Sequence, residues 1–372
     1  MGQVLRMTTK PGKIDIAAMK KFVNKSVGLD IAHDLREDNP TEVKEWIPTG
    51  SRWLDSITCR GRMGGIPIGK VTEIAGLSSA GKSYMAVQIA SNAQKMGITV
   101  VYFDAESAID PKFLENAGVD MSENFLYVQA VSVEKTLETI EDLMSEYPDN
   151  RFLFIWDSIA ATSSEKELES DFNPQTTMAV KPRIFSKAFP KLIIPLANQD
   201  CTLLVINQLK TNIPRTPAEA MVTPYIAPGG KAIEYFSSQR IWLTKRKAKA
   251  AYVTDESGVR VGSEVKIKIE KSRFGTEGRT CGFKIMWGDR VGIQDEESWL
   301  EALRLSGSDR FKSGAWSKIY SKDGKEFKFQ RSSWIEKLKN DEFRQAVLDI
   351  MDEEIIKKFD SEGKNVNIDS ED

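Results

Sequence analysis

Short, continuous runs of apolar residues alternate with amphipathic stretches through the first half of the chain. The apolar runs predict strands over residues 71–75, 98–103, 152–156 and 202–207. Apolar positions at helical spacing predict helices over residues 82–95, 111–117, 133–145 and 183–197, with Gly97 and Gly118 ending the first two. Continuous apolar strands separated by helices are typical of a parallel sheet that is covered on both faces. The pattern therefore predicts an α/β fold.

Later in the chain the pattern changes to alternation of apolar and polar residues. A strand is expected over residues 239–245, and alternation follows from Val265 to Ile269 and from Cys281 to Trp287. Because Gly275 and neighbouring turn residues separate the last two segments, we expect a hairpin that extends the sheet. After about residue 298 come two or three helices and a small strand region. This part is predicted to form a small α+β C-terminal domain.

The two ends of the chain differ from its middle. Residues 14–27 have apolar side chains at helical spacing with lysines between them, which predicts an amphipathic helix that either caps its own core or docks on a partner. Residues 360–372 are polar and mostly acidic. We therefore expect a docking helix and linker over residues 1–48, a core over 49–297, a C-terminal domain over 298–359 and an acidic disordered tail over 360–372.

Composition narrows the compartment and the chemistry. The 372 residues carry a net charge of -2, so binding to nucleic acid would require a locally basic surface. Three cysteines without close pairing favour a reducing, cytoplasmic setting. The chain has one histidine, which leaves proton chemistry to carboxylates. No apolar run approaches the roughly 20 residues of a membrane span, so no membrane partner is expected.

A phosphate-binding loop lies between the first predicted core strand and the helix that follows. Its sequence fits G-x-x-x-x-G-K-[ST] in the strand-to-helix context that this pattern requires. Backbone N–H groups and the helix N-terminus would bind phosphate oxygens, the lysine would reach the β- and γ-phosphates of ATP, and the final serine would ligate Mg²⁺. The predicted nucleotide-binding residues here are Gly76, Leu77, Ser78, Ser79, Ala80, Gly81, Lys82, Ser83 and the next residue, Tyr84.

Two carboxylates follow other predicted strands. Asp157 ends the apolar run 152–156 and is expected to hold the hydration shell of Mg²⁺. Glu106 follows the strand at 98–103 and could orient the attacking water as a general base, although a solvated loop carboxylate is an equal alternative on spacing alone. Ligands of parallel sheets bind at the carboxyl ends of the strands, where both residues lie.

Several dispersed segments carry a further signal. They are Phe103–Pro111, Leu204–Gln208, Gly229–Ala232, Ser263–Glu264, Gly314–Trp316 and Gly324–Lys325. These segments resemble the RecA family of DNA strand-exchange ATPases from bacteria and phages, and the similarity runs in order from about residue 13 to about residue 350. The resemblance implies a P-loop RecA-like ATPase core with a small N-terminal helix region and a small C-terminal domain.

The resemblance implies roles for further residues around the nucleotide. Gln208 would sense the γ-phosphate, and Lys271 and Arg273 would reach the ATP of a neighbouring subunit. Arg273 stands where the family has a lysine. The adenine would lie near Asp110 and Phe113, the latter in a position where the family commonly has tyrosine.

Two loops would line a DNA channel by the same resemblance. The first covers about residues 163–182, and the second covers residues 209–228 and contains four prolines. Their charged, apolar and glycine residues would contact single-stranded DNA. The residues expected there are Met178, Arg183, Lys210, Arg215, Gly229, Gly230 and Lys231.

The resemblance implies a recombinase that forms a helical filament of many copies on single-stranded DNA. It would use ATP and Mg²⁺, pair with homologous double-stranded DNA and exchange strands. The C-terminal lysines Lys318, Lys322, Lys325 and Lys328 could gather the duplex. A ring-forming RecA-like DNA helicase or motor ATPase is the main alternative, and a nucleotide-gated scaffold without turnover is another. The location expected is the bacterial cytoplasm, or that of the host if the chain is phage-encoded.

Three further positions depart from the family pattern. Glu234 stands where bacterial relatives have a lysine near the subunit interface, and Pro190 replaces a basic residue near the DNA side. Lys231 replaces the asparagine of the Gly-Gly-Asn-Ala segment. The details of contacts at these positions are therefore not carried over from the family.

Overall fold

The computed structural model of the chain describes residues 15–28, 31–36, 39, 41–170, 180–212, 225–245, 251–287 and 291–356. The chain divides into two compact units, residues 1–44 and residues 45–372. The domain boundaries expected at residues 48, 297 and 359 stay predictions.

The first unit contains the predicted amphipathic helix, α1 (Ile16–Val27). The Asp15 side chain caps it by accepting hydrogen bonds from the N–H groups of Ala17 and Ala18. No residue of α1 is buried. Phe22 is 73% exposed, and three further apolar residues of the helix are about half exposed: Ile16, Met19 and Val27. The helix therefore does not cap a core within its own unit.

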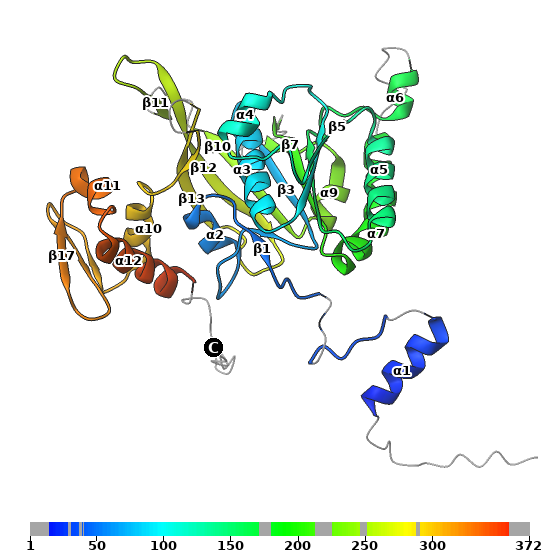
Figure 1. The fold of residues 1–372 in the computed structure, drawn as a ribbon, viewed down its shortest axis with the longest axis horizontal. Coiled ribbons are helices and arrows are strands. Elements are labelled where there is room, and N and C mark those ends of the chain that lie inside the picture. Colours follow the sequence, from blue (N-terminus) through cyan, green and yellow to red (C-terminus); the bar gives the residue numbers. More distant parts are fainter. Residues whose placement is uncertain are drawn as a thin grey trace, which may run out of the picture. The chain divides into compact units, whose positions relative to one another are not determined.

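The second unit is built on one large sheet (Figure 1). Strands β10, β3, β7, β6, β4 and β5 run parallel, and β12, β13 and β14 continue the sheet in antiparallel fashion beyond β10. The prediction of a parallel sheet extended by a hairpin is therefore confirmed. In spatial order the strands are β14 (Gly292–Gln294), β13 (Thr280–Met286), β12 (Arg260–Ser272), β10 (Gln239–Lys245), β3 (Val71–Gly76), β7 (Thr202–Gln208), β6 (Phe152–Asp157), β4 (Thr99–Asp104) and β5 (Phe125–Gln129), with β11 (Tyr252–Thr254) paired to β12.

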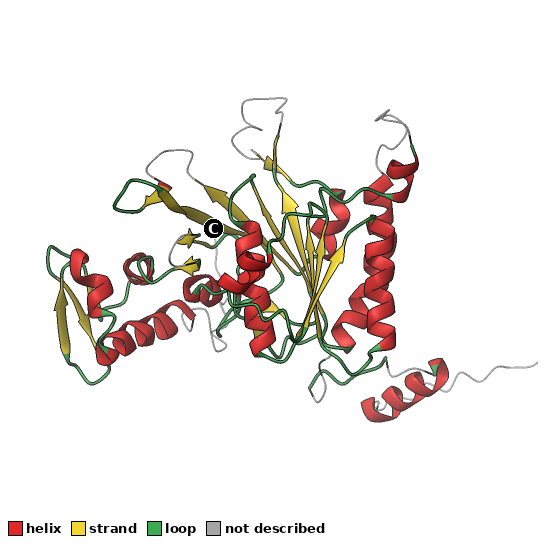
Figure 2. Cartoon of the chain, turned by 45° about the horizontal axis from the view of Figure 1, so that its top comes forward, coloured by secondary structure: helices red, strands yellow, loops and turns green. Residues whose placement is uncertain are grey.

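Helices cover both faces of this sheet (Figure 2). Side chains that alternate along a strand point to opposite faces. Leu204 and Ile206 of β7 accordingly join the buried cluster that includes α3, whereas Leu203 and Val205 join the cluster that includes α5 and α7. The helices of the core are α3 (Lys82–Lys95), α4 (Pro111–Asn116), α5 (Val133–Glu146), α6 (Glu165–Glu169), α7 (Val180–Asn198) and α9 (Gly230–Phe236).

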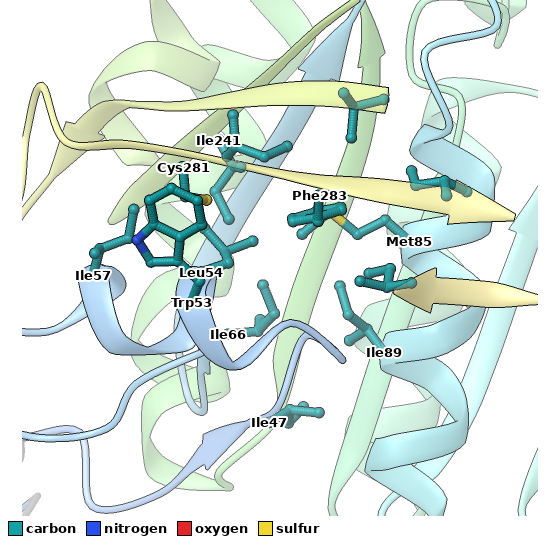
Figure 3. Close-up of a cluster of buried hydrophobic side chains, with 14 of the residues drawn as sticks. Ile47, Trp53, Leu54, Ile57, Ile66, Met85, Ile89, Ile241, Cys281 and Phe283 are labelled. Atoms are coloured by element: carbon teal, nitrogen blue, oxygen red, sulfur yellow. The ribbon is translucent and has the colours of Figure 1, made fainter. Parts of the chain in front are cut away.

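The buried cluster on the α3 face continues into the C-terminal part of the chain. Figure 3 shows Trp53 and Ile57 of α2 (Arg52–Thr58) beside Cys281 of β13. Trp299 and Phe343, from the C-terminal part, belong to the same cluster. The remaining elements are β1 (Trp46–Ile47), β2 (Ile66–Pro67), β8 (Lys210–Thr211), β9 (Tyr225–Ile226), α10 (Trp299–Ser306), β15 (Phe311–Lys312), β16 (Ser317–Tyr320), β17 (Glu326–Phe329), a 3₁₀ turn (Arg331–Ser333), α11 (Trp334–Lys337), α12 (Asp341–Ile350) and a π-helical turn (Met351–Ile356).

Some elements were not expected from the pattern. β5 lies at the edge of the sheet, and two of its side chains, Leu126 and Tyr127, are exposed. No strand was predicted here, although residues 125–128 are apolar, and none of the β5 residues is buried. α7 begins at Val180, before the predicted residue 183, and continues through Pro190 and Pro195. Among the described residues, no helix is long and apolar enough to cross a membrane.

A buried carboxyl group in α2 makes the stability of the fold depend on pH. Asp55 accepts hydrogen bonds from the N–H of Thr49 at 3.0 Å and from its hydroxyl at 2.6 Å. Burial raises the pKa of Asp55 from 3.8 to about 7, and the nearby charge of Asp295 acts in the same direction. The folded chain thus keeps this proton to a higher pH than the unfolded chain does.

Replacing Asp55 with asparagine should remove this pH dependence. The stability that protonated Asp55 contributes is fully present below about pH 4 and is lost as the pH rises through about 7. The amide of asparagine cannot ionise, so the variant should gain on the wild type across this window, by about 1.4 kcal/mol for each unit of pKa difference. Urea unfolding at pH 4.5, 6 and 8 measures the gain. An equal difference at all three values would contradict the expectation.

Candidate nucleotide and DNA site

The phosphate-loop residues connect β3 to α3 as predicted. Gly81 has φ 91°, and a Cβ there would lie 2.4 Å from Cδ1 of Ile285. A Cβ on Gly76 would lie 2.7 Å from the carbonyl oxygen of Leu243. Both glycines of the pattern are therefore required by close packing against the antiparallel half of the sheet and β10. Lys82 is the first residue of α3, so the N-terminus of this helix faces the loop.

The Lys82 side chain is folded over this loop. Its Nζ donates hydrogen bonds to the carbonyl oxygens of Gly76 at 3.2 Å and Leu77 at 3.1 Å. The residue is 8% exposed. A cation held among loop carbonyls, with backbone N–H groups nearby, suits the binding of an anionic phosphate chain.

Asp157 ends β6 close to the start of α3. Its Oδ2 accepts a hydrogen bond of 2.7 Å from the hydroxyl of Tyr102. Burial raises the pKa of Asp157, while hydrogen bonds from Ser83 and Tyr102 act to lower it. The predicted metal ligands Ser83 and Asp157 thus lie together. They supply a hydroxyl and a carboxylate oxygen, which are hard donors of the kind that Mg²⁺ prefers.

Glu106 is held at the carboxyl ends of β4 and β7. Its Oε1 accepts hydrogen bonds from the Ser158 hydroxyl at 2.9 Å and from Nε2 of Gln208 at 3.2 Å. The loop that carries Glu106 is fixed by Asp104, whose carboxylate accepts from the N–H of Glu106 at 2.9 Å and that of Ala108 at 2.9 Å. The predicted base and the predicted phosphate sensor are therefore in direct contact.

One cavity of about 510 Å³ brings these side chains together. Lys82, Ser83, Glu106, Asp157 and Gln208 all line it, together with the loop residues Ser78–Gly81 and with Tyr84. This convergence follows from the topology, because β3, β4, β6 and β7 are parallel neighbours whose carboxyl ends meet at one edge.

Two further residues of this cavity were not expected. Arg260 begins β12, and Trp287 follows β13. The Arg260 guanidinium lies over the rings of Tyr252, at 4.0 Å from the centroid, and Trp287, at 4.9 Å. Alternation along the hairpin had marked Trp287 only as an apolar position. The sequence pattern did not indicate that this hairpin borders the phosphate loop.

The two residues expected near the adenine, Asp110 and Phe113, lie in different surroundings. Phe113 lines a second cavity of about 260 Å³ with Tyr84 and Ile109. The Phe113 and Tyr84 rings meet edge to face with centroids 4.5 Å apart. Asp110 instead caps α4 by accepting the N–H of Lys112 at 2.7 Å, and it lines neither of these two cavities.

Lys271 and Arg273 lie at the end of β12 and after it, away from the cavity of their own chain. Lys271 Nζ donates to the carbonyl oxygens of Glu234 and of Tyr235, the latter at 3.0 Å. Arg273 donates to the same Tyr235 oxygen at 2.9 Å. Both cations therefore bind the C-terminal carbonyls of α9, where positive charge is favourable.

Gly230, one of the residues expected to contact DNA, lies next to the end of the first predicted loop. Gly229 and Gly230 have φ 98° and 71° and begin α9. A Cβ on Gly230 would lie 3.0 Å from Cβ of Pro182, so the ends of the two predicted loops touch. The three basic residues predicted here are exposed: Arg183 in α7, Lys210 in β8 and Lys231 in α9. Met178 and Arg215 lie outside the described residues.

The four C-terminal lysines are all paired with carboxylates. Lys318 and Lys328 lie 3.1 and 3.2 Å from Glu326, and Lys322 lies 3.1 Å from Glu353. Lys325 is paired with Glu342. Exposed pairs of this kind contribute little free energy, so the lysines are not committed to their present partners. Their role toward duplex DNA stays a prediction.

Comparison with known proteins gives matches over most of the chain. The model of the RecA N-terminal domain matches residues 14–293. Protein RecA of Sulfurimonas denitrificans is 34% identical over 273 residues, which cover 73% of this chain and 74% of that protein. Protein RecA of Mannheimia haemolytica is 30% identical over 303 residues, covering 81% and 76% of the two chains. Protein RecA of Aquifex pyrophilus is 30% identical over 290 residues, covering 77% and 78%.

Proposed function

The chain belongs to the RecA family over most of its length, and from that premise we propose that it is an ATP-dependent recombinase. In this proposal it forms helical filaments on single-stranded DNA and exchanges strands with homologous double-stranded DNA. The observation that carries the proposal is the cavity in which Lys82, Glu106, Asp157 and Gln208 converge.

ATP would bind with its phosphates over the loop at residues 76–83. Backbone N–H groups and Lys82 would hold the phosphate oxygens. Ser83 and Asp157 would hold Mg²⁺, which when bound neutralises charge on the phosphates. Glu106 would orient and deprotonate the attacking water, since its carboxylate lines the cavity and is fixed by Ser158 and Gln208.

Gln208 would connect the nucleotide to DNA. It ends β7, and the second predicted DNA loop begins at the next residue. Its amide bonds Glu106 in this structure at 3.2 Å. A γ-phosphate in the cavity would compete for that amide, and the loop that follows would respond. The exposed cations Arg183, Lys210 and Lys231 would meet the phosphates of the single strand.

Filament assembly would use residues that do not line the cavity of their own copy. The exposed apolar side chains of α1 would dock on a neighbouring copy. Lys271 and Arg273 would reach the nucleotide of that neighbour and stabilise charge on the transferring phosphoryl group. Each site would then be completed only by assembly.

The deciding measurement is ATP hydrolysis with Mg²⁺, with and without single-stranded DNA. Hydrolysis should be strongly stimulated by single strands, and the stimulation should fall steeply as salt is raised because phosphate contacts dominate binding. Lys82→Ala is the blank, since it removes the phosphate-binding cation. Electron microscopy of the stimulated complex should show filaments. Hydrolysis that ignores DNA would contradict the recombinase proposal, and closed rings would favour a helicase or motor.

A further inference from the structure

Tyr102 is a core residue whose hydroxyl reaches the candidate metal site. It lies within β4 with no exposed surface, and it donates a hydrogen bond of 2.7 Å to Oδ2 of Asp157. β4 and β6 are parallel, and Tyr102 is paired with Ile155, two residues before Asp157. Residues two apart share a face of a sheet. The ring therefore extends along this face toward the carboxyl ends of the strands.

The surroundings leave this ring little freedom. Tyr102 belongs to the buried cluster that contains Met85 and Ile89 of α3. The ring of Phe125 in β5 lies 6.5 Å away. The phenol hydroxyl can donate a hydrogen bond, and its donor is directed at Oδ2 of Asp157. A close-packed interior holds such a donor in one direction.

Asp157 therefore has two fixed hydroxyl neighbours, Tyr102 beneath it and Ser83 at the start of α3. The residue is 8% exposed and lines the cavity. Oδ2 accepts the hydrogen bond from Tyr102 on the core side. The remaining acceptor capacity is left for the Ser83 side and for the cavity. Groups that hydrogen-bond a metal-binding carboxylate set its orientation and its affinity for the metal.

We propose that Tyr102 is a positioning residue for Asp157, which it holds in the orientation that a divalent cation requires. The inference rests on the proposed function, because it presupposes a Mg²⁺–nucleotide complex in this cavity. A purely structural role is the competing explanation. Phenylalanine would fill the same space in the core without the hydroxyl.

The test is the Mg²⁺ requirement for binding a fluorescent ATP analogue, measured without turnover. In Tyr102→Phe the Mg²⁺ concentration at half-saturation should rise about 10-fold, as for other groups that orient metal ligands. Analogue binding in EDTA should stay close to that of the wild type. Tyr127→Phe is the matched control. It removes a hydroxyl from β5 that donates to Asp104 at 3.3 Å, and it should leave the Mg²⁺ midpoint unchanged.

A second pair of variants separates positioning from packing. In an Asp157→Asn background, adding Tyr102→Phe should shift the Mg²⁺ midpoint no further, because the hydroxyl acts through that carboxylate. An equal shift in both backgrounds, or no shift in Tyr102→Phe alone, would overturn the proposal. A wild-type chain that binds no analogue at any Mg²⁺ concentration would contradict the proposed function instead, and would remove the premise of this inference.

Discussion

Glu106→Gln should lower ATP hydrolysis by about 10²–10⁴-fold while nucleotide binding is retained. Glutamine has the shape of glutamate, and its carbonyl oxygen can still accept from Ser158 and Gln208, so the loop should keep its position. It cannot accept the proton of the attacking water. The loss should therefore fall on kcat, and the affinity for an ATP analogue should change little.

Single-turnover hydrolysis and analogue binding, measured on the same preparation, check this result. Glu115→Gln is the matched control, since Glu115 is an exposed glutamate on α4. It should hydrolyse ATP like the wild type. If Glu106→Gln hydrolyses ATP at the wild-type rate, another group must orient the water, and the solvated loop carboxylate that spacing alone allowed becomes the better interpretation.

Arg240→Met should destabilise the folded chain by about 3–5 kcal/mol. Arg240 of β10 pairs with Glu73 of β3, and the two residues are also register partners in the parallel ladder. Glu73 is fully buried and also accepts a hydrogen bond from Nδ2 of Asn207 at 2.8 Å. Methionine keeps the apolar stem of arginine but leaves the Glu73 charge without its cation. Urea unfolding with the wild type measured in parallel gives the difference.

An exposed pair offers the contrast. Lys135 and Glu138 lie 2.8 Å apart on α5, and both side chains are more than half exposed. Lys135→Met should therefore change the unfolding free energy by no more than about 0.5 kcal/mol. A similarly small effect in Arg240→Met would contradict the expectation that the buried pair stabilises the fold.

The sequence pattern alone predicted those residues of the candidate site that directly follow an apolar strand. The phosphate loop, Asp157 and Glu106 each follow an apolar strand, and parallel strands bring such residues to a common edge. Gln208 came only from the family resemblance. Its contact with Glu106 depends on β7 lying next to β6 and β6 next to β4, an order of strands that the apolar runs do not encode.

The residues that the sequence pattern did not predict reach the cavity through contacts between distant parts of the chain. Arg260 and Trp287 border the cavity because the antiparallel hairpin lies beyond β10, on the phosphate-loop side of the sheet. Tyr102 reads as one more apolar position of a buried strand, since a pattern of burial does not show where a phenol hydroxyl ends. For the helix at residues 14–27, spacing predicted the element but left open whether it covers its own core, and the structure shows its apolar side chains exposed.

The two ends of the short helix α9 have different neighbours. Its first residues, Gly229 and Gly230, follow the predicted DNA loop, and its last carbonyls are neutralised by Lys271 and Arg273. In an assembly that drew these cations to a neighbour's phosphates, α9 would lose the charges that cap it. The free energy of ordering α9 would then depend on both nucleotide and DNA. Linkage requires such coupling to be reciprocal, so the factor by which DNA changes nucleotide binding would equal the factor by which nucleotide changes DNA binding.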